Sequence, residues 1–321
     1  MLSTLSACRG GQSTFAGAGV EALAVEQLFW WMLGGAVLVW VFVIGLSVYA
    51  TVVHPDRHSE KGGIRLILWG GVAFPVVVLT GLLAFGLGLM PELRAAADGP
   101  RIAVSGERFW WRIHYDTPAE PGVQRALPLD GGVESANELW LPLGRRSELM
   151  LGSPDVIHSF WVPAIAGKTD TIPGRINRLV LEPTKEGLYN GVCAEFCGTA
   201  HAQMGFRVRV VSQDAYDAYV AAQAAPAAVL DHPGRDAFMG NGCGACHQVR
   251  GTEAAGRVGP DLTHVGSRET LGAGLLALNA ETLRAFVADP AHEKPGVEMP
   301  AFSMIPETEL DAIAAWLEAL K

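Results

Sequence analysis

Two long stretches without a charged residue constrain the fold of this chain more than any other feature of its sequence. They cover residues 28–53 and 66–90. Each stretch exceeds the ~20 apolar residues that a helix needs to cross ~30 Å of hydrocarbon. Because buried helices of soluble proteins rarely stay uncharged for so long, the sequence predicts a hairpin of two transmembrane helices.

The basic residues around this hairpin predict its orientation. Arg57, Lys61 and Arg65 lie in the connection between the two stretches, whereas residues 1–27 contain one basic residue, Arg9. The positive-inside rule puts the connection in the cytoplasm. We therefore expect a protein of the bacterial inner membrane, embedded in lipid, with an exported segment at 1–27 and both termini on the periplasmic side.

Charge and cysteine content narrow the function. The chain has 24 basic and 33 acidic residues, a net charge of −9, so the basic surface typical of nucleic-acid binding is missing. Its five cysteines form two close pairs, Cys193/Cys197 and Cys243/Cys246, and a lone Cys8, which favours metal or cofactor chemistry over a disulfide scaffold. Small residues precede Cys8, as in lipoproteins, but the segment before it is too short for a signal core of about 7–15 apolar residues. We therefore expect Cys8 to be an ordinary cysteine and keep its lipidation as the less favoured alternative.

Residues 100–212 have a different pattern from the hairpin. Short runs of alternating apolar and polar residues are separated by turn residues such as Pro173-Gly174 and Glu186-Gly187. Many short strands at this spacing predict an all-β sandwich or barrel. The predicted strands cover residues 101–104, 109–115, 138–142, 148–152, 178–182, 188–192 and 206–211.

A group of soft metal ligands lies near the end of this region. Cys193, Cys197, His201 and Met204 follow one another at intervals of four, four and three residues. The spacing also fits one face of a helix, and the two thiols could form a disulfide. Flanking strand patterns and glycines favour a loop, and a disulfide gives no role to the imidazole and thioether. Such ligands suit copper in electron transfer, and two bridging thiolates require a second imidazole, for which His158 is the candidate.

The run Asp155–Asn177, together with Cys193–Met204, resembles cytochrome c oxidase subunit II. The resemblance implies a cupredoxin-like domain at 100–212 that holds the binuclear copper centre CuA. It also implies a magnesium ion at the border with subunit I, bound in part by the side chain of Glu195. It makes Glu60 a candidate for proton uptake, although a solvated loop charge is the better explanation of Glu60. The implied copper ligands are Cys193 and Cys197 as bridges, His158 and His201 as terminal ligands, Met204 as a weak ligand, and the backbone carbonyl of Glu195.

The C-terminal part contains the motif C-x-x-C-H. We expect a linker at 213–231, followed by an all-α class I cytochrome c domain at 232–321, with helices at 234–241, 281–288 and 307–320. Cys243 and Cys246 are spaced for covalent attachment of haem c, and His247 is the axial ligand of the iron. Pro260 is expected to accept the other N–H of that histidine. Met299, in an irregular loop, is favoured over Met304 as the sixth ligand.

Together these features predict a multi-domain subunit of a caa-type haem–copper oxidase, a proton-translocating enzyme whose oxygen chemistry lies in subunit I. Electrons would pass from a cytochrome c or a cytochrome bc complex to haem c, then to CuA and to haem a of subunit I. The alternatives are a CuA subunit of a nitric oxide reductase and a membrane-tethered electron shuttle. Family members that use a separate cytochrome c usually have tryptophan where this chain has Phe109. We therefore expect haem c to be the electron input and Phe109, Trp110 and Trp111 to form the surface that it faces. The alternative is that one or two of these aromatics belong to the core, since alternate strand residues face inward.

Overall fold

The structure is a computed structural model that describes residues 10–53, 59–93, 96–115, 127, 129 and 132–321. Two compact units make up the chain: Leu23–Ala96, and a larger unit that combines Met1–Ala22 with Ala97–Lys321. Cys8 lies outside the described residues, so its lipidation stays a prediction.

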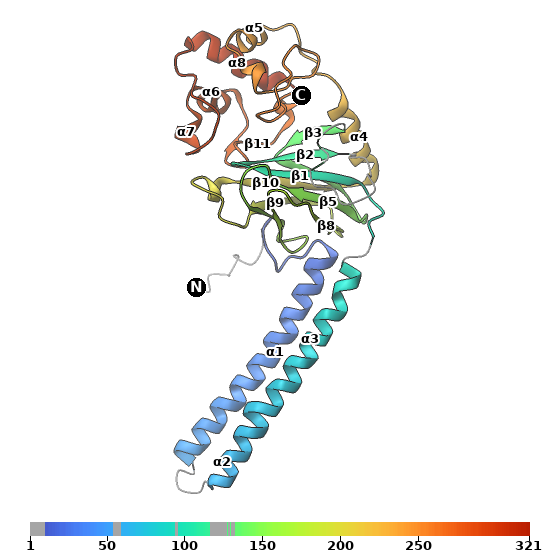
Figure 1. Cartoon of the computed structure of the whole chain (residues 1–321), viewed down its shortest axis with the longest axis vertical. Helices are drawn as coiled ribbons and strands as arrows, with labels where there is room; N and C mark the ends of the chain where they lie inside the picture. The colour runs from blue at the N-terminus through green and yellow to red at the C-terminus, as the bar shows by residue number, and fades with distance from the viewer. Residues whose placement is uncertain (1–9, 54–58, 94–95, 116–126, 128, 130–131) are drawn as a thin grey trace, which may run out of the picture. The chain divides into compact units, whose positions relative to one another are not determined.

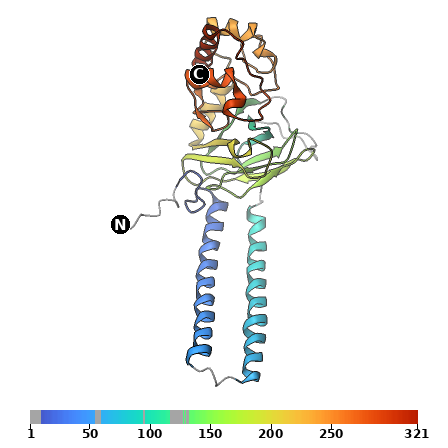
Figure 2. The same ribbon diagram turned by 90° about the vertical axis from the view of Figure 1, so that its left-hand side faces the viewer.

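The smaller unit is a helical hairpin (Figures 1 and 2). Helix α1 (Val20–Val48) continues as a π-helical turn, Tyr49–Val53, and the chain returns through α2 (Glu60–Leu66), a π-helical segment, Ile67–Ala73, and α3 (Phe74–Leu93). Val20–Val53 and Glu60–Gly88 are each long and apolar enough to cross a membrane. The two long apolar helices that the sequence predicts are confirmed, and most of their large apolar side chains are exposed.

The first part of the larger unit is a sandwich of two five-stranded sheets. Three of its strands, β3, β6 and β7, escaped prediction because they are only three or four residues long. One sheet has the order β3 (Val133–Ala136), β2 (Trp110–Tyr115), β1 (Arg101–Glu107), β5 (Ser147–Gly152), β8 (Asn177–Leu181). The other has the order β4 (Glu138–Pro142), β10 (Gly205–Val211), β9 (Gly187–Cys193), β6 (His158–Trp161), β7 (Thr169–Thr171).

The core of the sandwich follows from the period of two in its strands. In β10, Phe206, Val208 and Val210 are buried, and the residues between them are half-exposed. Inward-pointing residues of both sheets therefore meet in one apolar layer. Trp111 lies in this layer, where its ring contacts the rings of Phe160 and Phe206 edge-on.

The N-terminal segment packs against the sandwich. Ala18 is buried; its N–H donates to the carbonyl of Ala164 at 2.6 Å, and its carbonyl accepts from the N–H of Thr184 at 2.8 Å. The N–H of Val20 donates to Glu182 at 3.0 Å. The residues that lead into α1 are thus part of the sandwich unit.

Helix α4 (Gln213–Ala224) replaces the first half of the expected linker. Ser212 caps its N-terminus, Tyr216 and Val220 are buried in the sandwich core, and the ring of Tyr219 stacks on Trp140 at 4.1 Å. The prediction of a linker over 213–231 is therefore wrong for 213–224, because these aromatic and apolar residues bury a helical face. Only residues 225–232 separate α4 from the next helix.

The remaining chain is helical and has its own core. It contains α5 (Pro233–Gly240), α6 (Ala280–Ala288), α7 (Pro290–Glu293) and α8 (Glu307–Ala319), as the sequence predicts for all but the short α7. Helices α5 and α8 touch at Gly234, where a Cβ atom would lie 2.0 Å from the carbonyl oxygen of Ala312. Trp316 of α8 is fully buried and packs on Phe238. Two short strands, β11 (Thr270–Leu271) and β12 (Leu276–Ala277), form a hairpin between α5 and α6.

Candidate metal centre and haem pocket

The soft ligands of the sandwich converge at one end of the second sheet. Cys193 is the last residue of β9, and the loop 194–204 returns to β10 at Gly205. This loop holds Cys197, His201 and Met204, as the flanking strand patterns predict, and its helical part is limited to one 3-10 turn, His201–Gln203. His158 is the first residue of β6, whose Phe160 pairs with Cys193. Strand pairing thus places the distant imidazole beside the metal loop.

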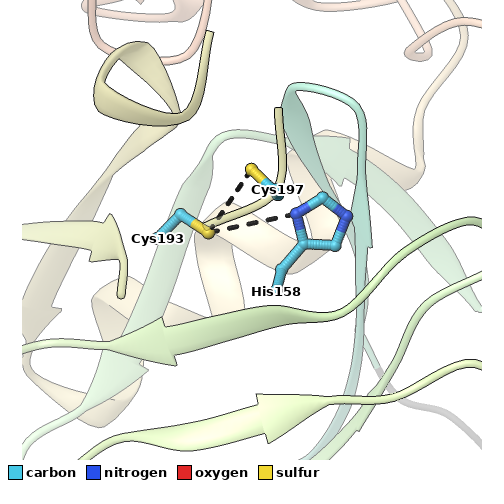
Figure 3. Close-up of side chains that lie close together, drawn as sticks. All are labelled: His158, Cys193 and Cys197. Carbon is cyan, nitrogen blue, oxygen red and sulfur yellow. Dashed lines mark hydrogen bonds between the residues drawn. The ribbon is translucent and has the colours of Figure 1, made fainter. Parts of the chain in front are cut away.

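The ligand atoms of this cluster lie within a few ångströms of one another (Figure 3). The Sγ atoms of Cys193 and Cys197 are 3.9 Å apart, and neither cysteine forms a disulfide. Nδ1 of His158 lies 3.9 Å from Cys193 Sγ, and Nδ1 of His201 lies 3.6 Å from Cys197 Sγ. Met204 Sδ is 3.8 Å from Cys197 Sγ. Two thiols, two imidazoles and a thioether therefore surround one small space.

A backbone carbonyl completes this set. The oxygen of Glu195 lies 3.2 Å from Cys193 Sγ, while the Glu195 side chain is exposed. His158 and Met204 are 0% and 1% exposed, and both thiols are buried. A buried, rigid set of sulfur and nitrogen donors fits a thiophilic metal ion that changes its coordination little on oxidation.

Asp155 orients one of the imidazoles. Its carboxylate accepts from Nε2 of His158 at 2.9 Å, so that Nδ1 is left for the space between the thiols. Burial would raise the pKa of Asp155, but hydrogen bonds from His158 and from the N–H groups of Val156 and Arg108 outweigh it and lower the pKa to about 2. The ionised carboxylate holds the histidine in the tautomer that a metal needs. Sequence reasoning did not assign Asp155, although its position three residues before His158 is a usable signal.

The two thiols differ in acidity. Burial raises the pKa of Cys193, but the hydrogen bond with His158 and backbone contacts outweigh it, so the pKa is lowered. Burial and the neighbouring Cys193 raise the pKa of Cys197. Bound metal must displace the remaining thiol proton, because the thiolate is the ligand.

The C-x-x-C-H motif lines a second cavity, in the helical region. Cys243, Cys246 and His247 contribute to its wall, and Met299 does so from the loop after α7. Apolar side chains from α6 and α8 complete much of the lining, as an apolar macrocycle requires. Met304, the alternative ligand, is 75% exposed and does not line the cavity.

The hydrogen bonding of His247 leaves its Nε2 atom available to bind iron. Its Nδ1 donates to the carbonyl of Pro260 at 2.8 Å, the contact that the sequence predicts. Burial lowers the pKa of His247, so the imidazole is neutral and Nε2 keeps its lone pair. Gly259 permits this approach, because a Cβ atom there would lie 2.4 Å from Cε1 of His247.

Comparison with known proteins assigns both regions. The model described as cytochrome c oxidase subunit II, periplasmic domain, matches residues 121–211, and the cytochrome c model matches residues 232–321. Cytochrome c oxidase subunit 2 of Alkalihalophilus pseudofirmus is 36% identical over 254 residues, which cover 78% of this chain and 69% of the relative. The chain belongs to the cytochrome c oxidase subunit II family.

A further relative and one solved structure are also similar to this chain. Cytochrome c oxidase subunit 2 of Bacillus sp. strain PS3 is 31% identical over 278 residues, covering 80% of this chain and 72% of the relative. The periplasmic domain of cytochrome oxidase subunit II from Bradyrhizobium japonicum is a similar solved structure, 28% identical with a TM-score of 0.35, covering 40% of this chain and 96% of that one. The chain is an electron-transfer subunit of a haem–copper terminal oxidase with a fused cytochrome c region.

Family membership implies CuA in the sandwich and haem c in the helical region. The residues present fit both groups. The buried cluster of His158, Cys193 and Cys197 has its ligand atoms within 4.8 Å of one another, as a shared metal site requires. In the helical region, two thiols and a neutral imidazole face one apolar cavity.

The three aromatic residues expected to face the haem divide into two groups. Phe109 and Trp110 line the haem cavity from the sandwich side. The prediction that Trp111 belongs to that surface is wrong, because Trp111 is fully buried. The centroid of its ring lies 6.1 Å from that of the His158 ring. Successive strand residues point to opposite faces, which sends Trp111 into the core and Trp110 toward the cavity.

Proposed function

We propose that the metal loop and His158 hold the binuclear copper centre, and that the C-x-x-C-H motif and Met299 hold one covalent haem c, which is the electron input to the copper. The copper ligands are then Cys193, Cys197, His158, His201, Met204 and the carbonyl of Glu195. Cys243 and Cys246 attach the haem, and His247 and Met299 are its axial ligands.

The observation that supports this proposal best is the packing of the two thiols. At 3.9 Å apart, each beside its own imidazole, Cys193 and Cys197 can each contact two metal ions. Copper and haem, when bound, supply the one-electron carriers of the oxidase.

The chain's own residues hold these carriers in fixed geometry. Asp155 fixes the ring of His158, and Pro260 fixes the ring of His247. The end of β9 holds Cys193 and the loop after it holds Cys197, both buried, so that little rearrangement would accompany a change in the charge of the bound metal. Apolar walls keep water from the haem pocket, which favours a high haem potential with a thioether ligand.

Two further parts of the proposal concern a magnesium ion at Glu195 and the side of the membrane on which the termini lie. A carboxylate beside the copper loop is suited to a magnesium ion shared with subunit I, as in the family. The N-terminal residues pack on the sandwich through Ala18 and Thr184, so they lie on the side of the membrane where the copper domain lies. Both termini are then periplasmic, and the donor is a cytochrome c or a cytochrome bc complex.

The test is spectroscopic and uses the purified native complex. Cys197→Ser should abolish the mixed-valence copper signal and leave the haem spectrum, which serves as the internal control. Met299→Ala should lower the haem potential and remove the sulfur-to-iron absorption band, whereas Met304→Ala should change neither. An intact copper signal in Cys197→Ser, or loss of the band only in Met304→Ala, would refute the respective assignment.

A further inference from the structure

Lys294 is buried where the sandwich and the helical region meet, although lysine is rarely buried. It is 2% exposed and follows α7 directly. Its Nζ donates to the carbonyl of Phe109 at 2.7 Å and to the carbonyl of Gly272 at 2.6 Å. The first acceptor is 185 positions away in sequence and belongs to the sandwich. One side chain therefore bonds both regions of the larger unit.

The residues after Lys294 touch the metal loop itself. Oγ1 of Thr199, which lies between Cys197 and His201, donates to the carbonyl of Pro295 at 3.0 Å. Gly296 adopts φ +83°, and a Cβ atom there would lie 2.1 Å from Oγ1 of Thr199. Only a glycine permits this approach without displacement of the metal loop.

The same short segment reaches the haem cavity. Val297, Glu298 and Met299 line that cavity, so residues 294–299 contact the metal loop at one end and supply the haem ligand at the other. The ring of Phe109 lies beside both the metal loop and this segment. It would be 3.0 Å from a Cβ atom of Gly198 in the metal loop and 3.5 Å from one of Gly296.

A second contact between the sandwich and the helical region lies on the His247 side of the haem pocket. Arg112 of β2 donates to the carbonyl of Arg257 at 2.9 Å, close to the loop that bonds His247. Ion pairs with Glu107 and Glu134 fix the Arg112 guanidinium. The two axial-ligand loops of the haem pocket are thus both bonded to strand β2 or to the residue before it.

We propose that residues 294–299 form the electron-transfer bridge between the haem pocket and the metal loop, and that Lys294 is the positioning residue that holds this bridge against Phe109. The proposal rests on the proposed function. One electron leaves the reduced haem iron and reduces the copper centre, with no proton or bond exchanged. The bond from Thr199 to Pro295 joins the metal loop to the segment that carries the haem ligand, and Lys294 keeps it formed.

The test compares Lys294→Met and Thr199→Val with Lys168→Met, a matched substitution of an exposed lysine of the sandwich. In the native complex, the haem is reduced by a light pulse and the transfer of its electron to copper is followed optically. We expect the rate to fall about tenfold or more in Lys294→Met and in Thr199→Val, because small displacements of reacting groups have large effects on rate. The haem potential and the copper spectrum should not change, and Lys168→Met should match the parent.

A second measurement does not depend on electron transfer. Hydrogen exchange of the amides in residues 294–299, measured on the full chain before loading with copper or haem, should be faster in Lys294→Met than in Lys168→Met. Parent-like transfer and exchange in both Lys294→Met and Thr199→Val would overturn the bridge. If the parent complex itself shows no transfer from haem to copper, the proposed function fails instead, so the two failures are distinguishable.

Discussion

Glu138 should make the larger unit less stable as pH rises above 5. Its side chain is 8% exposed, and one carboxylate oxygen accepts from the N–H of Glu269 at 2.6 Å, a bond between the sandwich and the helical region. Burial raises the pKa of Glu138 to about 7, against the opposing effect of Arg268, Arg209 and Arg207.

The direction of this pH dependence follows from the difference between the pKa of Glu138 in the folded and in the unfolded chain. The unfolded chain ionises this carboxyl near its ordinary pKa of 4.5, while the folded chain keeps it protonated up to about 7. Ionisation therefore destabilises the fold progressively between these values and fully above them. At about 1.4 kcal/mol per pKa unit, the cost above pH 7 is about 3 kcal/mol. Glu138→Gln keeps the acceptor and removes this cost.

Thermal unfolding of the purified chain at a series of pH values measures the effect. Glu138→Gln should match the parent near pH 4.5 and exceed it at pH 8, by roughly 6–12 °C in the melting temperature for a unit of this size. Glu186→Gln, at an exposed turn, is the matched control and should follow the parent throughout. A constant difference between Glu138→Gln and the parent from pH 4.5 to 8 would refute the assigned burial cost.

Two further predictions concern the sites and the helical core. Asp155→Asn should weaken copper binding about 10- to 100-fold, measured by competition with a chelator, because the ring of His158 loses the carboxylate that orients it; an unchanged affinity would contradict this role. Gly234→Ala should lower the stability of the helical region by about 3 kcal/mol, since its Cβ atom would lie 2.0 Å from the carbonyl of Ala312. Urea unfolding followed by the haem absorbance checks it, with Gly240→Ala, where a Cβ atom meets nothing within 4 Å, as the control.

Local patterns in the sequence were sufficient for much of the fold and for the composition of the candidate sites. The apolar stretches predict both membrane helices, and the amphipathic pattern of Glu307–Ala319 predicts α8. The metal loop could be predicted because its ligands lie within twelve consecutive residues, Cys193 to Met204. His158 required an argument from chemistry, that two thiolates need a second imidazole, and strand pairing then places it correctly.

Features that depend on contacts between distant segments could not be predicted. Helix α4 resembles a linker in composition, and its helical form depends on the burial of Tyr216 and Val220 against strands far away in sequence. Lys294 gives no local sign of burial, because its acceptor at Phe109 is reached only through the tertiary fold. Strand alternation indicates that one or two of Phe109, Trp110 and Trp111 face inward, but only the tertiary packing identifies Trp111 as a fully buried one.

Because the connection between α4 and α5 is short, the facing surfaces of the sandwich and the helical region need not attract each other from solution. Ala227 within it is buried, and its N–H donates to the carbonyl of Arg250 at 2.9 Å, so the helical region is held close to the sandwich from the moment it is made. Proteins that meet by diffusion use complementary charge to find each other, and that attraction weakens with salt. Here no search is needed. Charged groups at the joint, such as the pair Arg209–Glu269, therefore serve to align the two regions rather than to bring them together from solution.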